Sequence, residues 1–395
     1  MLDMEGFATK LQHNIVRGLE RSLNRKPLSR GDFRRTKIRR ILIVCDHNNL
    51  GDLLLATPVF RAVRQNFPVA YIAVVVKADL ADVLIGNIFV NAVILFYQRW
   101  RQWTPRRLVH FLKRVRSKYD LAIVLNVVSH SLPGDLIAFL SRARYVLGSE
   151  YPLLPGASWN FFYNLLASYS QKNRHLTERH LDIVRYLDID TNVRTEVINL
   201  SKDEKAWAEV FFAEHGLASD DLIVAIHIGA DDIGKQWEVK KFVQVAKYLT
   251  THHRAKIIVS WGECKEDLGR EFLNGLPFPA VILSGLPVRH LAATIYFADV
   301  MVCNDCDLMH VAASVGTSLV AIFCNSPPEE SKPIGEEFVA LKAKSSGAIG
   351  IDIVIESVLK LMEDHPKRQR FDAENFDISD EVLKDYLDIL NTFDE

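Results

Sequence analysis

The feature that most constrains this chain is a series of short, wholly apolar runs rich in β-branched residues, with helix-like stretches between them. The first run is Ile41–Cys45, and the next three span residues 71–76, 92–96 and 121–125. Runs of this kind are typical of strands that are buried on both faces of a parallel sheet. Their alternation with helical segments predicts an α/β architecture, with helices covering both faces of such a sheet.

The same pattern starts again near residue 200. Ser201 followed by Glu204 is the signature of a capping box that opens a helix, and further apolar runs span residues 222–227, 256–260, 281–283, 300–303 and 319–323. A length of 395 residues is comfortable for two domains. We therefore predict two Rossmann-like, doubly wound domains that face a central cleft.

The predicted boundaries follow from these patterns. We expect a basic N-terminal arm over residues 1–40, a first Rossmann-like domain over 41–200 and a second Rossmann-like domain over 201–350. Residues 351–395 contain two predicted helices, which by analogy with other two-domain proteins of this kind pack back on the N-terminal domain.

The N-terminal arm is strongly basic although the whole chain has a net charge of −1. Between Lys10 and Arg40 there are eleven Lys or Arg and two Asp or Glu. Apolar residues recur every four positions, which predicts a helix with an apolar face and a basic face; they are Phe7, Leu11, Ile15, Leu19 and Leu23. Two interpretations stay open: residues 7–40 bind an anionic membrane surface, or the helix packs on the protein or a partner. Nucleic acid is disfavoured, because no aromatic residues alternate with the charges.

The five cysteines are scattered, which indicates a reducing compartment rather than a disulfide framework. No apolar run is long enough to cross a bilayer, and the N-terminus has no signal-peptide core. We therefore expect a cytoplasmic protein, either free or peripheral on the inner face of the cytoplasmic membrane. Aromatic residues at 159 and 161–163 either stack on sugars or fill a core, and we favour the core.

Ligands of doubly wound sheets bind beyond the carboxyl ends of the strands. After the first run comes Asp46–Asp52, which is not the Gly-x-Gly-x-x-Gly loop of a dinucleotide-dependent dehydrogenase. In this loop Gly51 permits a tight turn or a close ligand approach. Asp52 either caps the next helix or acts as a general base at the end of the strand.

Three more strand ends in the second half carry candidate residues. His227 and Gly229 followed by Lys235 suit a phosphate, which backbone N–H groups and one cation would hold; otherwise Lys235 is a surface residue. Glu266 lies where a carboxylate often holds a ribose, although acidic residues also favour the first turn of a helix. The segment from Asn304 to Thr317 predicts a helix start that suits pyrophosphate.

Two alternatives involve metal ions. Asp305 and Asp307 have the Asp-x-Asp spacing of a chelating pair, but adjacent acids are also common in loops. Cys303 and Cys306 have Cys-x-x-C spacing without a second Cys or His pair, which disfavours a zinc site.

Three ordered motifs together resemble glycosyltransferase family 9, the lipopolysaccharide heptosyltransferases. The segment 41–64 resembles the opening strand, the loop ending Leu-Gly-Asp and the helix with Thr-Pro. The segment from His227 to Phe242 resembles the His-x-Gly, Lys-x-Trp motif, and Asn304 to Thr317 resembles the Asn-Asp-Ser-Gly motif. The resemblance covers roughly residues 41–330 and implies the GT-B fold.

The resemblance also implies roles for single residues. Asp52 would be the general base of an inverting transfer from ADP-heptose to a glycan or lipid-linked acceptor. Lys235 and the helix that starts near Leu308 would neutralise charge on the pyrophosphate, and Glu266 would bind the ribose. No cofactor and no essential metal are implied, with Mg²⁺ not required. The other matched positions would bind the donor: Asn49, Gly51, Thr57, His227, Gly229, Asp305, Cys306, Asp307 and His310.

The chain departs from the family pattern where the third motif usually has Ser-Gly. Here it has Cys306 and Asp307, which place an anion beside the expected pyrophosphate. Two alternatives to the heptosyltransferase therefore stay open. One is a catalytically silent relative that binds a sugar nucleotide or a partner. The other is a GT-B enzyme with a different nucleotide sugar, in which Asp307 assists a metal.

Overall fold

The structure is a computed structural model that describes residues 16–364, apart from residues 19, 24, 128–129, 152, 169–172, 263–264 and 343–348. Within these residues the chain divides into two compact units. The first contains residues 16–81 and 87–194, and the second contains residues 82–86 and the chain from Thr195 onward. Within the described part, no helix combines the length and the apolar character needed to cross a membrane.

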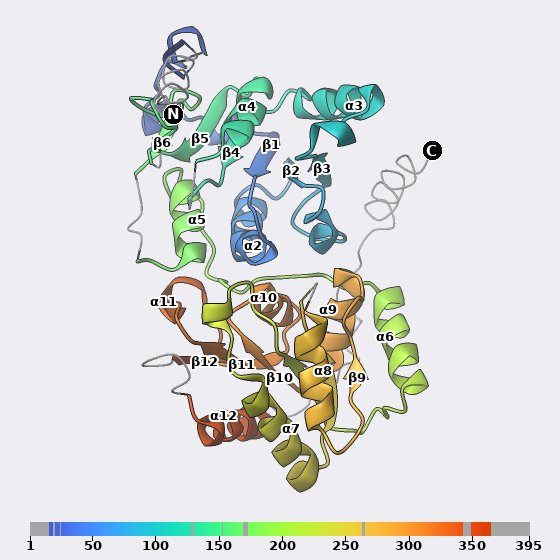
Figure 1. Ribbon diagram of the computed structural model, residues 1–395. Coiled ribbons are helices and arrows are strands. Elements are labelled where there is room, and N and C mark those ends of the chain that lie inside the picture. The colour runs from blue at the N-terminus through green and yellow to red at the C-terminus, as the bar shows by residue number, and fades with distance from the viewer. Residues whose placement is uncertain are drawn as a thin grey trace, which may run out of the picture. The chain divides into compact units, whose positions relative to one another are not determined.

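The first unit is built on a six-stranded parallel sheet with the strand order β3-β2-β1-β4-β5-β6. Figure 1 shows the helices of this unit around the sheet. Its elements are η1 (Arg30–Asp32), η2 (Arg35–Lys37), β1 (Arg40–Cys45), α2 (Leu50–Asn66), β2 (Tyr71–Lys77), β3 (Ala92–Phe96), η4 (Trp100–Gln102), α3 (Pro105–Val115), β4 (Leu121–Val124), α4 (Leu132–Leu140), β5 (Tyr145–Ser149), β6 (Leu165–Ala167) and α5 (Leu176–Arg185); the turn η3 (Ala81–Leu84) lies between β2 and β3.

The second unit repeats this plan. Its sheet is parallel, with the order β12-β11-β10-β7-β8-β9, which is the order of the first sheet when the strands are counted from β7. Its elements are α6 (Lys202–Glu214), β7 (Ile223–His227), η5 (Ile233–Lys235), α7 (Val239–His253), β8 (Lys256–Ser260), α8 (Glu266–Gly275), β9 (Val281–Ile282), α9 (Val288–Phe297), β10 (Val300–Asn304), α10 (Asp307–Ser314), β11 (Ser318–Phe323), α11 (Pro328–Ser331), β12 (Phe338–Lys342) and α12 (Ile351–Asp364). Both units therefore have the doubly wound Rossmann order, and this prediction is confirmed.

All nine predicted strands are present, within a residue or two at each end. The sequence pattern missed β5, β6 and β12. These are short runs, of which β6 has three residues, and two of them lie in the region around residues 148–200 that shows little periodicity. The strands β6 and β12 lie at sheet edges, where the apolar signal is less needed, whereas β5 is an inner strand whose apolar run is cut short by Gly148 and Ser149.

The aromatic segment 159–163 belongs to the core of the first unit, as expected. Phe161, Phe162 and Tyr163 are at most 2% exposed and pack with residues of β1, β4 and β5. Gly148 in β5 is required by this packing, because a Cβ atom there would lie 2.4 Å from the ring of Tyr163.

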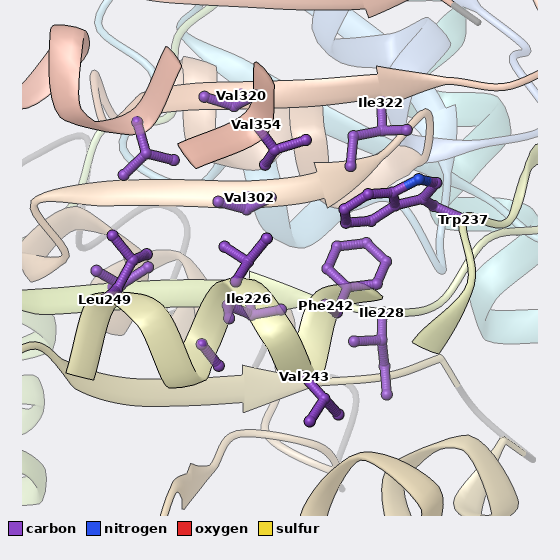
Figure 2. Close-up of a cluster of buried hydrophobic side chains, with 14 of the residues drawn as sticks. Ile226, Ile228, Trp237, Phe242, Val243, Leu249, Val302, Val320, Ile322 and Val354 are labelled. Atoms are coloured by element: carbon purple, nitrogen blue, oxygen red, sulfur yellow. The ribbon is translucent and has the colours of Figure 1, made fainter. Parts of the chain in front are cut away.

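The core of the second unit is built around Trp237 and Phe242, which are both fully buried (Figure 2). Their rings meet edge to face, with centroids 4.9 Å apart. The helix α12 contributes Val354 and Val358 to this same core. The prediction that the C-terminal helices pack on the N-terminal domain is therefore wrong for residues 351–364, whose apolar face is needed by the second sheet; residues 365–395 lie outside the described part.

The division between the units falls at Arg194 and Thr195, not at residues 200 and 201 as predicted. The capping box at the start of α6 is present, with the Ser201 side chain accepting from the backbone N–H of Glu204. The extended segment before it is tied to α10, because the Ile198 N–H donates to the Ser314 carbonyl over 3.0 Å. A capping signal marks where a helix begins, which need not be where a domain begins.

The described part of the basic arm packs on the first unit. Val16 is 4% exposed within the core, and Leu23 packs against it. The Arg25 guanidinium, predicted to lie on the basic face, donates to the Ala143 carbonyl over 2.9 Å and lies over the ring of Phe139. The interpretation that the arm packs on the protein therefore holds for these residues; Phe7, Leu11, Ile15 and Leu19 lie outside the described part.

Candidate active site

Strand order reverses next to β1 in the first sheet and next to β7 in the second. Ligands of doubly wound sheets bind at these switch points, beyond the carboxyl ends of the two strands on either side. The strand pairs are β1 with β4 and β7 with β10. Three of the four predicted strand-end segments follow β1, β7 and β10, and the fourth follows β8.

In the first unit, Asn49 and Asp52 share the start of α2. Asn49 is the N-cap, and its side-chain oxygen accepts from the Asp52 N–H over 2.8 Å. The alternative that Asp52 caps the helix is therefore wrong, and its half-buried carboxylate lies in the first turn, where the helix dipole favours an anion. Gly51, buried in the same turn, does not have a positive φ.

Thr57, predicted to bind the donor, is fully buried. Its hydroxyl donates to the Leu54 carbonyl over 2.7 Å. The next residue is Pro58, which has no N–H to give that same carbonyl four residues back. The Thr-Pro pair thus repairs the hydrogen bond that the proline removes, and with no exposed surface Thr57 offers the donor no contact in this structure.

A polar network that the sequence pattern missed joins the ends of β1, β2 and α4. Lys77 follows the apolar part of β2, and its Nζ donates to the Asn48 Oδ1 over 2.6 Å and lies 3.5 Å from the Asp46 Oδ1. The Ser131 hydroxyl, which caps α4, donates to the Asp46 carboxylate. Lys77 and Asp46 are nearly buried, with side-chain exposures of 6% and 9%. The network fixes the loop that carries Asn49 and Asp52.

A second buried group lies next to this network. The His130 Nε2 is 2.5 Å from the Asp135 Oδ2, and the Tyr163 hydroxyl donates to the Asp135 Oδ1. Burial raises the pKa of Asp135, although the hydrogen bond from His130 acts to lower it. The sequence does contain ionisable side chains just after β1 and β4. Recognising them as one cluster, however, requires knowing that these two strands are neighbours.

His47 and His180 form a neutral pair in the same unit. Their rings meet edge to face with centroids 5.0 Å apart. Burial and then Lys77 lower the pKa of His47 to about 4, and burial and then His47 hold the pKa of His180 well below its usual value. Among the described residues, the His47 Nε2 and both ring nitrogens of His180 have no hydrogen-bond partner.

In the second unit, Asn304 at the end of β10 organises the loop after β7. Its amide nitrogen donates to the carbonyls of Ile228 and Gly229, and its oxygen accepts from the Trp237 N–H over 2.9 Å. A Cβ atom at Gly229 would lie 2.8 Å from the Gly262 nitrogen, so this position requires glycine. Trp237 is buried in the core of this unit and anchors the loop that carries Lys235 (Figure 2).

Lys235 reaches the acidic segment after β10. Its Nζ lies 2.9 Å from the Asp305 Oδ2, which also accepts from the Ser326 hydroxyl over 2.5 Å. Burial acts to lower the pKa of Lys235, but the hydrogen bond from its ammonium to Asp305 raises it above the usual value. The side chain is 36% exposed, so this cation is charged and accessible to a ligand.

The start of α10 brings three more predicted residues together. Cys306 is its N-cap residue, Asp307 is in the first turn and Leu308 follows, 8% exposed. Hydrogen bonding from the Cys303 thiol, and then His227, hold the pKa of the Cys306 thiol below its usual range. Burial, and then the charge of Asp307, raise the pKa of Asp231 on the neighbouring loop. Anions therefore already surround this helix N-terminus.

His310 lies one turn further along α10 and is paired with Glu196, which the sequence pattern missed. The His310 Nδ1 is 3.0 Å from the Glu196 Oε1, and the two residues are 4% and 6% exposed. Burial acts to lower the pKa of His310, but the charge of Glu196 raises it above the usual value. Glu196 belongs to the segment before α6, where no strand-end rule applies.

Two predicted residues remain. His227 is buried next to Cys306, with its Nδ1 2.8 Å from the Ser260 hydroxyl oxygen. Glu266 is exposed in the first turn of α8, as either of its two interpretations requires. Within the part of the chain that the structure describes, no group of three or more His, Cys, Asp or Glu is arranged to hold a metal ion.

Comparison with known proteins gives a consistent result. The model of glycosyltransferase family 9 (heptosyltransferase) matches residues 108–349. The chain is 27% identical over 281 residues to lipopolysaccharide heptosyltransferase 3 of Escherichia coli, covering 69% of this chain and 80% of that protein.

Two solved structures share the fold. The glycosyl transferase family 9 protein of Veillonella parvula has a TM-score of 0.72 at 20% identity and covers 82% of this chain and 97% of its own. The E. coli ADP-heptose LPS heptosyltransferase II has a TM-score of 0.66 at 21% identity, covering 82% and 99%. With a family match over more than half of its length and this shared GT-B fold, the chain belongs to glycosyltransferase family 9 and is a glycosyltransferase.

Proposed function

We propose that this enzyme transfers a heptose, or a related sugar, from an ADP-activated donor to a glycan acceptor of the lipopolysaccharide type. The observation that carries the proposal is the pairing of Lys235 with Asp305 beside the start of α10. A cation, backbone N–H groups and a helix N-terminus are what a pyrophosphate requires. Two of the relatives named above are lipopolysaccharide heptosyltransferases, and one of these is named for ADP-heptose.

In this proposal Asp52 is the general base. Its carboxylate takes the proton of the acceptor hydroxyl as that oxygen attacks the anomeric carbon. The bond from this carbon to the pyrophosphate oxygen breaks, and the electron pair leaves with ADP. A single displacement inverts the anomeric centre and needs no covalent enzyme intermediate. Asn49 supports this role because its cap orients the turn that carries Asp52.

Charge on the departing ADP would be stabilised by the second unit. Lys235 is the partly exposed cation, backbone N–H groups at the start of α10 would donate to the pyrophosphate, and Glu196 raises the pKa of His310. Groups fixed in place before the reaction are the most effective at stabilising charge that develops during it. The displacement needs no metal, and Glu266 would bind the ribose.

The first unit would bind the acceptor. Asn48 and Asn49, which are both exposed, lie at the carboxyl-end side of this sheet with the half-buried Asp52. Such groups suit a ligand rich in hydroxyls. We place the enzyme in the cytoplasm, peripheral at the inner membrane face, where a lipid-linked acceptor is accessible.

A donor screen tests the proposal. Purified protein is incubated with a heptose-containing lipopolysaccharide core acceptor and ADP-heptose, UDP-sugars or GDP-sugars, with Mg²⁺ or with EDTA. We expect transfer from the ADP-sugar alone, undiminished by EDTA. Transfer that requires Mg²⁺, or a preference for another nucleotide, would instead support the GT-B enzyme with a different donor.

Asp307 favours a second candidate function, a catalytically silent binder. Its carboxylate lies in the first turn of α10, next to the predicted pyrophosphate position. If this anion excludes the donor, no nucleotide will bind and no transfer will occur. Asp307→Gly then restores ADP binding in a silent protein, but only modestly improves it in an active enzyme.

A further inference from the structure

A concentration of positive charge separate from the N-terminal arm lies on η4 and α3 of the first unit. From Tyr97 to Tyr119 the chain has no Asp or Glu and eight Lys or Arg, although the net charge of the whole protein is −1. The eight are Arg99, Arg101, Arg106, Arg107, Lys113, Arg114, Arg116 and Lys118. We call residues 99–118 the η4–α3 surface.

The helix α3 divides these residues into two faces. Thr104 caps the helix, Pro105 opens it, and Phe111 and Val115 are buried in the core. The opposite face carries cations at three- and four-residue spacings, which place them on one side of the helix; the exposed residues there are Arg106, Val109, Lys113 and Arg116.

Apolar side chains stand exposed among these cations. Trp100 is 78% exposed and Val109 is 66% exposed. The Arg101 guanidinium lies over the Trp100 ring, 5.5 Å from its centroid. An exposed tryptophan and an exposed valine surrounded by arginines are the composition of a surface that lies at a membrane–water interface, where the ring enters the headgroup region.

No acidic residue of α3 balances the positive charges on this surface. Arg106 and Arg107 occupy the first turn, where the helix dipole already disfavours a cation. Burial, and then the charges of Arg114 and Lys113, lower the pKa of His110. A partner that carries many negative charges would relieve these repulsions.

A shallow pocket lies between β3 and α3. Tyr97, Arg107, His110 and Arg114 provide its polar lining, and apolar residues of β3 and Phe111 provide the rest. Guanidinium groups bind phosphate oxygens through paired hydrogen bonds. The pocket is suited to the phosphate of a lipid headgroup.

The η4–α3 surface also begins at the functional edge of the first sheet. Since η4, which begins with Trp100, and α3 follow β3 directly in the chain, they begin after the carboxyl end of that strand. The loop with Asp52 follows β1 at the same edge, with β2 between them. Parallel strands are about 4.8 Å apart, so the ends of β1 and β3 are separated by about 10 Å.

We propose that the η4–α3 surface binds the anionic headgroups of a phospholipid bilayer. The cations attract the headgroups, and Trp100 and Val109 insert among them. We favour this surface over the described arm because the apolar residues Val16 and Leu23 of the arm are turned to the core, so that its exposed cations have no exposed large apolar side chain beside them. Its purpose, bringing Asp52 to a lipid-linked acceptor, rests on the proposed function; the binding itself does not.

Cosedimentation of the full chain with vesicles tests the proposal without substrate or turnover. One vesicle is phosphatidylcholine alone, and the other contains phosphatidylglycerol as well. We expect binding only to the anionic vesicle, with a loss at high salt. Each cation near such a surface contributes about fivefold in affinity, so R106E/K113E is expected to weaken binding by at least about tenfold. Trp100→Ala is expected to weaken binding to the same vesicle severalfold.

The control is K240E/K247E, which makes the same change in charge at the same seven-residue spacing on the exposed face of α7. It is expected to leave binding within about twofold, and a circular dichroism melt checks that both variants fold. Equal losses in both variants, binding that ignores Trp100, or a preference for a single-stranded oligonucleotide over the anionic vesicle would overturn the proposal. Transfer to a water-soluble acceptor, measured on the same variants, reports on the catalytic function separately.

Discussion

At the residue scale, the pair of Glu196 and His310 is the feature of the site furthest from any sequence pattern. Both side chains are buried, and the His310 Nδ1 lies 3.0 Å from the Glu196 Oε1, within hydrogen-bonding distance. Ser314 also reaches the same carboxylate, over 3.4 Å. The carboxylate of Glu196 therefore favours the protonated form of His310 on α10, near the predicted pyrophosphate position.

This pairing makes stability depend on pH. The pKa of His310 in the folded protein lies above its usual value. Its stabilising effect is therefore fully present below about pH 6.5, the ordinary histidine pKa, and is lost as the pH rises through the raised value. We expect Glu196→Gln to lower the free energy of unfolding by about 1–3 kcal/mol below pH 6.5 and by less at high pH. Denaturant melts across the pH range measure this; a penalty independent of pH would show that His310 is not charged.

Asp52 has a sharper test because its predicted role concerns only the chemical step. We expect Asp52→Asn to lower kcat by about 10²–10⁴-fold, the range for general bases, while ADP affinity stays unchanged. Asn49→Ala removes the cap but keeps the base, so it should lower kcat less and cost about 1 kcal/mol of stability. Steady-state kinetics with ADP-heptose separate the two, and equal kcat values for the wild type and Asp52→Asn would remove Asp52 from the mechanism.

At the element scale, α2 shows how the Thr-Pro pair works inside a helix. Pro58 cannot donate to the Leu54 carbonyl, and the Thr57 hydroxyl donates to it instead. Thr57 is fully buried, and its hydrogen bond stabilises the helix whose first turn carries Asp52. Its place in a family motif thus has a structural reason.

A double-mutant cycle measures this repair. Thr57→Val should cost about 1–3 kcal/mol, because it leaves a buried carbonyl without its partner. In a Pro58→Ala background the alanine N–H can donate to that carbonyl, so the cost of Thr57→Val should fall. Unfolding in urea gives both values, and an equal cost in the two backgrounds would show that the hydroxyl serves something other than the Leu54 carbonyl.

The elements also show what a sequence can reveal. Strands buried on both faces, such as β1 and β10, have an unmistakable composition, and the residues just after them were identified correctly as strand-end residues. Residues such as Lys77 and Ser131 were missed because their importance depends on which strands and helices are neighbours. Glu196 was missed because its partner is more than a hundred positions away in the chain. Thr57 was predicted to contact the donor but is fully buried, because a sequence motif specifies which residue is present and not how far it is exposed.

At the scale of the whole molecule, the proposed mechanism divides its steps between two units that have the same strand order. The first has the carboxylate Asp52 and a network of buried polar groups at the end of β1. The second has Lys235, Asp305 and the start of α10 at the ends of β7 and β10. Donor binding can therefore be tested on the second unit's residues independently of the transfer step.

The central claim is that the second unit binds an ADP-activated donor, and calorimetric titration of the full chain with ADP tests it most directly. We expect ADP to bind in preference to UDP and GDP, with an affinity that falls about tenfold or more in Lys235→Ala, rises severalfold in Asp307→Gly and stays unchanged in Asp52→Asn. No binding of any nucleotide to the wild type, or equal affinity in Lys235→Ala, would contradict the account.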